Sequence, residues 1–193
     1  MQSTPGWTVI GALSAPVLLV AGWVIGAALQ PPGYDAIRDT ISALAAQGAS
    51  DRWVMGGALI GVGIGYLVIA VGLRAAPLTG RAVLAIGGVA TCLVAAFAQP
   101  AHGNSVTHTI AAAVAFLALA TWPIFAGRRF ASSPLLLAGV SRTASAVLVG
   151  LVVWFALELH GNQRGLAERV AATAQALWPL LVVISARRSR LQT

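Results

Sequence analysis

Six long apolar stretches dominate the pattern of the chain. They cover residues 7–29, 53–73, 82–99, 106–125, 135–157 and 170–186. Each is close to the length of about 20 residues that a helix needs to cross the hydrocarbon core of a bilayer. In the fifth stretch Arg142 lies near one end, from where its long side chain can reach water. The pattern therefore predicts an all-α polytopic membrane protein, with six transmembrane helices in three hairpins and one domain over residues 1–193.

The segment 35–46 has a different pattern. A Pro-Pro-Gly sequence at residues 31–33 ends the first helix before it. Helical periodicity then places Ile37, Ile41 and Leu44 on one face, opposite Asp35, Arg38, Asp39 and Ser42. Because the segment is too short and too charged to span a bilayer, we expect a short amphipathic helix on the outer surface of the membrane.

Composition supports a membrane protein and excludes several classes of soluble protein. The chain is 58% hydrophobic and 9% charged, with a mean hydropathy of +0.85. A soluble domain carries roughly 25% charged residues, so a soluble enzyme, a disordered protein and a nucleic-acid-binding domain are excluded. All 12 basic residues are arginines. We attribute the net charge of +7 to membrane topology and attraction to anionic lipid.

The arginines predict the orientation of the chain in the membrane. If both termini are cytoplasmic, the inner segments carry Arg74, Arg81, Arg128, Arg129, Arg142, Arg187, Arg188 and Arg190. The outer segments carry Arg38, Arg52, Arg164 and Arg169, together with all five acidic residues. Since cytoplasmic loops are enriched in Lys and Arg, we expect both termini on the cytoplasmic side.

Glycines repeat every fourth residue along one face of the second span, at Gly57, Gly61 and Gly65. Small residues at this spacing let two transmembrane helices approach closely. We favour a partner helix in the same chain. A second copy of the chain or another membrane protein is the alternative.

A short pattern recurs in the second half of the chain. Phe97 and the sequence His102-Gly103-Asn104 return as Phe155 and His160-Gly161-Asn162, in each case 58 residues later. The second and third hairpins therefore resemble copies in the same orientation. This internal repeat predicts that His102 and His160 lie at the same end of the bundle.

The candidate site lies at the outer ends of the helices, where ionisable groups gather. The candidate ligand-binding residues are Arg38, Asp39, Ser42, His102, His108, Glu158, His160, Glu168 and Arg169. Arginine binds phosphate and carboxylate groups, and apolar helix faces hold a hydrocarbon tail. Our first hypothesis is therefore the binding, sensing or transport of a lipid or small amphiphile at an outward-facing polar pocket. No pattern assigns a catalytic role.

Two alternatives remain open at this stage. His102, His108 and His160 could hold a zinc ion together with Asp39 or Glu158, as in a metal-dependent lipid hydrolase. The same histidines could equally be hydrogen-bonded loop and helix-cap residues, and we assign no cofactor. The protein could also be an accessory subunit of a membrane complex.

Two segments carry a resemblance to a known family. They are Tyr34-Asp35 with Arg38-Asp39-Thr40-Ile41-Ser42-Ala43-Leu44, and Gly165-Leu166-Ala167-Glu168-Arg169 with Trp178 nine residues later. The sequence resembles the bacterial and archaeal family called domain of unknown function 998. The resemblance implies a six-span protein of a prokaryotic cell membrane, and it implies no activity. It raises Arg38, Asp39, Ser42, Glu168 and Arg169 above the other polar residues. We expect replacement of Arg38 or Glu168 to do more damage than replacement of Arg164.

Overall fold

The computed structural model describes residues 4–191 and consists of helices and loops. Its long helices are α1 Trp7–Ala28, α3 Trp53–Gly72, α4 Leu78–Ala96, α5 Val106–Ala126, α6 Ala138–Glu158 and α7 Arg164–Leu191. The short elements are α2 Ile41–Leu44 and the 3-10 helix η1 Pro134–Leu136. Each of the six long helices contains a segment long and apolar enough to cross a membrane. The predicted fold class, a polytopic all-α membrane protein, is confirmed.

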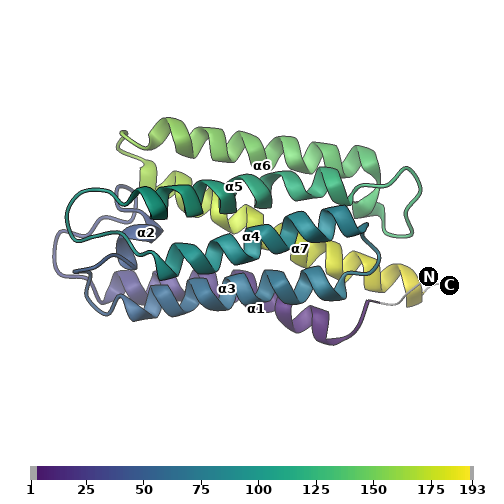
Figure 1. Cartoon of the computed structure of the whole chain (residues 1–193), viewed down its shortest axis with the longest axis horizontal. Helices are drawn as coiled ribbons and strands as arrows, with labels where there is room; N and C mark the ends of the chain where they lie inside the picture. Colours follow the sequence, from purple (N-terminus) through teal and green to yellow (C-terminus); the bar gives the residue numbers. More distant parts are fainter. Residues whose placement is uncertain (1–3, 192–193) are drawn as a thin grey trace.

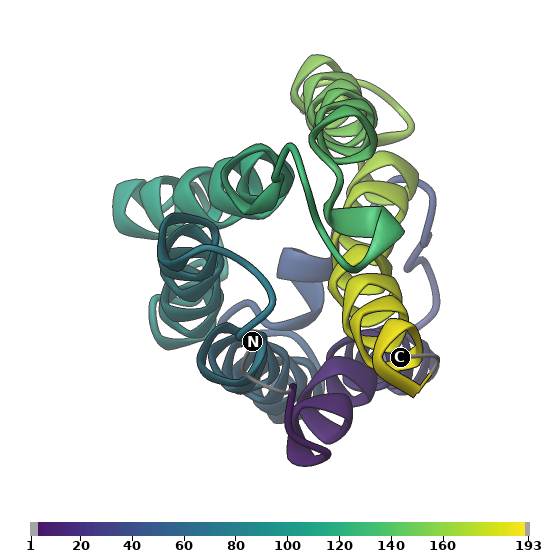
Figure 2. The ribbon, with the colours of Figure 1, turned by 90° about the vertical axis from the view of Figure 1, so that its right-hand side faces the viewer.

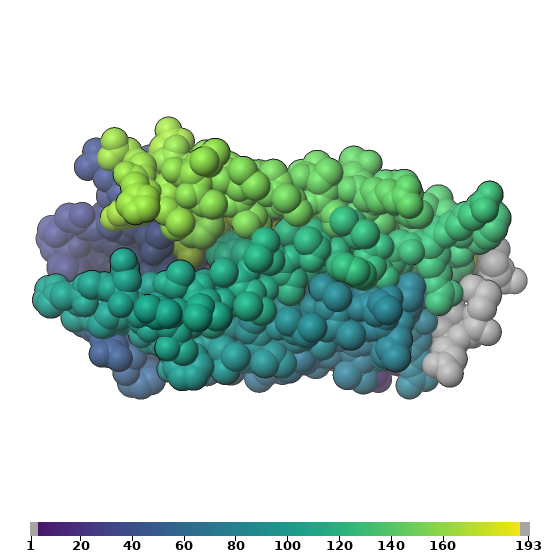
Figure 3. All heavy atoms as spheres, turned by 45° about the horizontal axis from the view of Figure 1, so that its top comes forward, coloured from purple at the N-terminus to yellow at the C-terminus, as the bar shows by residue number. Residues whose placement is uncertain are grey.

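The six long helices form a ring. Each packs against its neighbour in the chain, and α7 returns to α1 and closes the ring. Figure 2 looks along the bundle and shows α2 inside the ring at its far end. Helix α6 packs mainly against α5 and α7, and it is the least buried of the six spans. Figure 3 shows α6 along one side of the molecule, beside α5.

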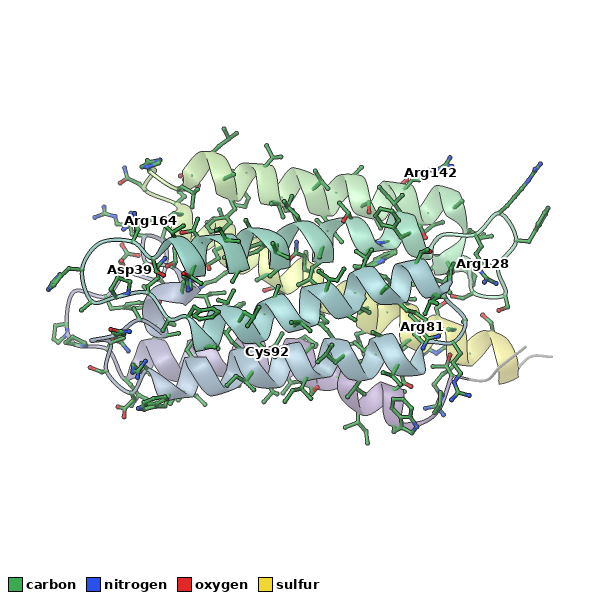
Figure 4. The ribbon with its side chains drawn as sticks, viewed as in Figure 1. Asp39, Arg81, Cys92, Arg128, Arg142 and Arg164 are labelled. Atoms are coloured by element: carbon green, nitrogen blue, oxygen red, sulfur yellow. The ribbon has the colours of Figure 1, made fainter. Side chains whose placement is uncertain are left out.

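The two ends of the bundle differ in charge. One end, which we call the α2 end, carries α2 and the loops 29–52, 97–105 and 159–163. The opposite end carries the start of α1, the end of α7 and the loops 73–77 and 127–137. Figure 4 places Asp39 and Arg164 at the α2 end and Arg81, Arg128 and Arg142 at the opposite end. The uneven distribution of charged residues along the sequence therefore becomes a difference in charge between the two ends of the bundle.

Glycines allow close contact between α1 and α3. A Cβ atom added at Gly65 would lie 2.8 Å from the carbonyl oxygen of Gly11, and one at Gly61 would collide with the side chain of Leu18. A Cβ at Gly57 would meet nothing within 4 Å. The partner of Gly61 and Gly65 is therefore α1 of the same chain, which is the alternative that the sequence favoured.

Several helix ends differ from the limits drawn from hydropathy. Helix α4 begins at Leu78, four residues before the apolar stretch, and so includes Arg81. The Arg81 guanidinium donates to the carbonyl oxygens of Ala70 (2.6 Å) and Val71 (2.8 Å), which are at the C-terminal end of α3. Helix α7 begins at Arg164, six residues before the apolar stretch. In both cases charged side chains remain in the helix because they hydrogen-bond to neighbouring backbone.

The predicted amphipathic helix at 35–46 requires a correction. The structure has a helix only at Ile41–Leu44, with turns before it. Ile41 and Leu44 are almost completely buried, whereas the Ile37 side chain is 52% exposed. The segment enters the end of the bundle instead of lying on its surface. Its backbone groups hydrogen-bond to α7, so the helical hydrogen bonds that the periodicity predicted are largely absent.

Candidate functional site

The first turn of α7 binds the segment Tyr34–Ser42, which we call the 34–42 segment. The backbone N–H of Leu166 donates to the carbonyl oxygen of Ile37 (3.0 Å). Arg164 Nε donates to the carbonyl oxygen of Arg38 (2.8 Å). Gly165 permits this approach, since a Cβ there would lie 2.7 Å from the carbonyl oxygen of Ala36. The Gly-Leu-x-Glu-Arg motif therefore begins with residues that contact the backbone of the 34–42 segment.

Arg169 holds the carbonyl groups of the same segment. Its Nη1 donates to the carbonyl oxygens of Ala36 (2.6 Å), Asp39 (2.7 Å) and Gly165 (2.9 Å). Its Nη2 donates to the hydroxyl of Tyr34, and its guanidinium carbon lies 5.9 Å from the ring centroid of Trp23. Within residues 4–191 no carboxylate lies at ion-pair distance from this buried guanidinium. Backbone oxygens and an aromatic face take the place of a counter-ion.

Tyr34 accepts from Arg169 in its neutral form. Burial raises the pKa of its phenol above the ordinary value, against the opposing effect of the Arg169 charge and hydrogen bond. The phenol therefore stays protonated at physiological pH. It serves as an uncharged partner at the edge of the 34–42 segment.

Glu168 holds the hydrogen-bond donors of the segment. Its side chain is 4% exposed, and its Oε2 accepts from the backbone N–H of Ile41 (2.5 Å). Its Oε1 accepts from the hydroxyl of Ser42 (3.1 Å). The Thr40 hydroxyl accepts from the N–H of Ala43 (3.1 Å). Glu168 and Thr40 thus accept from N–H groups in the first turn of α2. Such N–H groups have no carbonyl partner four residues earlier within the helix.

Glu168 and Ser42 also line a cavity inside the ring of helices. The cavity has a volume of about 60 Å³ and is bounded by residues of α1, α2, α3, α4, α5 and α7. Since one water molecule needs roughly 10–15 Å³ of such space, the cavity has room for a few water molecules or a small polar group. Its polar lining residues are Ser42, Tyr66, Thr91, Glu168 and Gln175, and its other lining residues are apolar. Glu168 is the single charged residue among the described residues that line it.

Two polar lining residues are already bound to backbone. The hydroxyl of Thr91 donates to the carbonyl oxygen of Gly87 (2.8 Å). The amide nitrogen of Gln175 donates to the carbonyl oxygen of Phe116 (2.9 Å). Tyr66, Thr91 and Gln175 are lining residues that the sequence did not predict. The available signal was a polar side chain in the middle of an apolar span, which is costly unless it is partnered or functional.

Arg38 and Asp39 contribute mainly through their backbone. The Arg38 side chain is 67% exposed and lies 3.6 Å from the carboxylate of Asp35. The carboxylate of Asp39 accepts from the N–H of Asp35 (2.9 Å) and so closes a turn. Their carbonyl oxygens are the atoms that α7 binds. The contact of Arg38 with α7 is therefore made by its backbone carbonyl oxygen and not by its side chain.

The remaining candidates lie elsewhere at the α2 end. His102 and His160 are exposed in the loops before α5 and α7. His108 is buried, and its Nδ1 lies 2.9 Å from the carbonyl oxygen of Phe97 at the end of α4. A carboxylate oxygen of Glu158 accepts from the N–H of Gln163 (3.1 Å) within the α6–α7 loop. Among these residues, His108 and Glu158 therefore bind backbone groups at the ends of α4 and of the α6–α7 loop.

The histidines do not form a cluster with the acidic residues. In the part of the chain that the structure describes, no three His, Cys, Asp or Glu side chains are placed to hold a metal ion. The geometry of the side chains therefore offers no support for the zinc alternative. The two His-Gly-Asn sequences also differ in backbone, because Gly103 has a φ of 79° and Gly161 is outside the positive-φ region.

Comparison with known proteins gives one match. A family model described as "Protein of unknown function (DUF998)" matches residues 13–185, a range that contains both the 34–42 segment and the first turn of α7. No curated protein and no solved structure matches the chain. The matched range includes all of α2 to α6 and most of α1 and α7. The chain is therefore a member of the DUF998 family of proteins of unknown function.

Proposed function

We propose that this membrane protein binds a small amphiphile in the cavity between its helices. The observation that carries the proposal is the chemistry of the lining, with a buried carboxylate and a hydroxyl among walls that are otherwise mostly apolar. Binding sites for small molecules combine such apolar walls with a few polar groups that fix orientation. An ionisable residue within a transmembrane helix is itself a marker of function.

The recognition group in this proposal is Glu168, not an arginine. Arg169 is unsuited to bind a headgroup in this cavity, because it is not among the lining residues and both of its terminal nitrogens donate to Ala36, Asp39, Gly165 or Tyr34. A ligand head that donates hydrogen bonds fits the carboxylate of Glu168 instead. The hydrocarbon part would lie among side chains such as Leu59, Val62 and Phe116.

The volume of the cavity limits what enters it. About 60 Å³ accommodates a small head, whereas a typical site for a drug-sized ligand measures roughly 300–1,000 Å³. A longer ligand therefore requires a displacement of α2 or of the helices around it. Short-chain amphiphiles are the appropriate first probes.

The proposal is tested with 1-hexanol and a variant that fills the cavity. Ala112 lines the cavity, whereas Ala113, the next residue of α5, is exposed on the outer face of the bundle. We expect 1-hexanol to raise the thermal unfolding midpoint of detergent-purified wild type and of Ala113→Leu, since a ligand that binds the folded state stabilises it. Ala112→Leu should lose this response. An equal response in all three proteins would show that 1-hexanol acts on the outer surface and would refute the proposal.

A further inference from the structure

We infer that the cavity selects amphiphiles with a compact, positively charged head, with a primary alkylammonium as the simplest example. This inference rests on the proposed binding of an amphiphile and names its chemical class.

The carboxylate of Glu168 lacks a counter-ion. It is 4% exposed, and among the side chains of residues 4–189 no arginine or histidine lies within ion-pair distance of it. The remaining lining residues that the structure describes are uncharged. Ionising a buried carboxylate that has no partner ion is costly, and a cation that enters the cavity lowers that cost. An anionic head would add a second negative charge.

Arg169, the next residue in the chain, makes no ion pair with Glu168. Its guanidinium binds carbonyl oxygens at Ala36, Asp39 and Gly165 and the hydroxyl of Tyr34. Glu168 binds the following residues of the same segment, Ile41 and Ser42. The two side chains therefore serve different atoms, and the cavity is lined by Glu168 and not by Arg169.

The carboxylate of Glu168 and the hydroxyls of Ser42 and Thr91 offer acceptors to a ligand. Each oxygen of Glu168 accepts one hydrogen bond, from Ile41 or Ser42, whereas a carboxylate can accept about four in all. The hydroxyls of Ser42 and Thr91 use their protons on Glu168 and on the carbonyl of Gly87, so they have only lone pairs left. A primary ammonium carries three donors and no acceptor. It matches this lining better than a hydroxyl does, and it is small enough for a cavity of about 60 Å³.

The inference is tested with three probes that share one alkyl chain. Hexylammonium, 1-hexanol and hexanoate are titrated into detergent-purified full-length protein at neutral pH, and the dissociation constants are measured. We expect hexylammonium to bind about ten-fold more tightly than 1-hexanol, because hydrogen bonds between charged partners are stronger than neutral ones. Hexanoate should bind more weakly than 1-hexanol.

Variants then locate the source of the preference. Glu168→Gln should bind hexylammonium and 1-hexanol equally, whereas Glu158→Gln, which makes the same change in the α6–α7 loop, should keep the preference. Ser42→Ala removes a hydroxyl whose lone pairs the ammonium would use, so it should reduce the preference, and it provides a second variant should Glu168→Gln fail to fold. A preference that survives in folded Glu168→Gln would overturn the inference.

The outcomes with wild type separate this inference from the proposed function. If 1-hexanol and hexylammonium bind equally at the cavity, the charge selectivity is wrong and the binding of an amphiphile stands. If hexanoate binds best, the charge selectivity is also wrong. If none of the three probes binds, both proposals are refuted.

Discussion

At the scale of single residues, Glu168 and Arg169 hydrogen-bond to different groups of the 34–42 segment. The guanidinium takes carbonyl oxygens of the 34–42 segment, and the carboxylate takes an N–H and a hydroxyl. Backbone polar groups that enter a dry environment without partners cost free energy. An acid followed by a base at the start of α7 satisfies both kinds of group at once.

Arg169→Lys should destabilise the protein although it preserves the charge. A lysine ammonium is a single point on a flexible chain, so it cannot reach Ala36, Asp39 and Tyr34 together as the planar guanidinium does. We expect a loss of about 1–3 kcal/mol in the free energy of unfolding, measured by denaturation in detergent.

Arg38→Ala is the contrasting change, because this side chain is 67% exposed and only its carbonyl oxygen contacts α7. It should leave stability nearly unchanged. The sequence had predicted that Arg38 matters more than Arg164, and the geometry now predicts the reverse. Equal losses for Arg169→Lys and Arg38→Ala would contradict this account of the site.

Gly165→Ala should also destabilise, for a steric reason. The added methyl group would lie 2.7 Å from the carbonyl oxygen of Ala36, which is backbone and yields poorly. Overpacking of this kind costs about 1–3 kcal/mol. The matched control is Gly150→Ala in α6, where nothing lies within 4 Å. A helical Gly→Ala change in open space stabilises by roughly 0.5–1 kcal/mol, so opposite shifts of the unfolding midpoint are expected, and shifts of the same sign would refute the close approach.

At the scale of elements, α2 is the part most dependent on its surroundings. A helix of four residues is not stable by itself. It is held by Glu168 at its first turn, by the Thr40 cap and by contact between Leu44 and α1. Because α2 contributes Ile41 and Ser42 to the cavity lining, its position controls one end of the cavity.

A disulfide can test whether ligands enter past α2. A Cβ at Gly26 would lie 3.7 Å from the Cβ of Leu44, within the range of roughly 3.5–4.5 Å found in disulfides. We expect Gly26→Cys with Leu44→Cys, in a Cys92→Ala background, to bind 1-hexanol more slowly when oxidised than when reduced. The single-cysteine variants control for the substitutions. Equal binding rates in the two states would indicate entry between the long helices.

At the scale of the whole molecule, the asymmetry of charge predicts the orientation in the membrane. All five acidic residues lie at the α2 end, and the arginines are concentrated at the opposite end. The enrichment of arginine in cytoplasmic segments predicts that the α2 end faces outward.

Single cysteines in exposed loops can test this orientation. In a Cys92→Ala background, Asn162→Cys reports on the α2 end and Ser132→Cys on the opposite end, since both positions are exposed. A membrane-impermeant maleimide added to intact cells should label Asn162→Cys and spare Ser132→Cys until the cells are opened. The reverse pattern of labelling would overturn the predicted orientation.

The sequence by itself determined the number of spans and the fold class. Whether a helix can span the membrane depends on the length of one apolar stretch relative to the thickness of the bilayer, and this length is a local property of the sequence. The motif at residues 165–169 and the Arg-Asp-x-x-Ser pattern were visible without a structure. The helical periodicity of residues 35–46 correctly placed Ile41 and Leu44 on a buried face, but Ile37, which it placed on the same face, is 52% exposed.

Only the tertiary structure decided how these residues meet. Ile41 and Glu168 are 127 residues apart, so no local pattern could predict that one caps the other. Hydropathy excluded the first turn of α7 from the last span because it is charged, yet those charges are satisfied by backbone from the 34–42 segment. The cavity likewise depends on side chains from six helices. Sequence periodicity describes one helix at a time, whereas burial and hydrogen-bond satisfaction depend on every element packed around it.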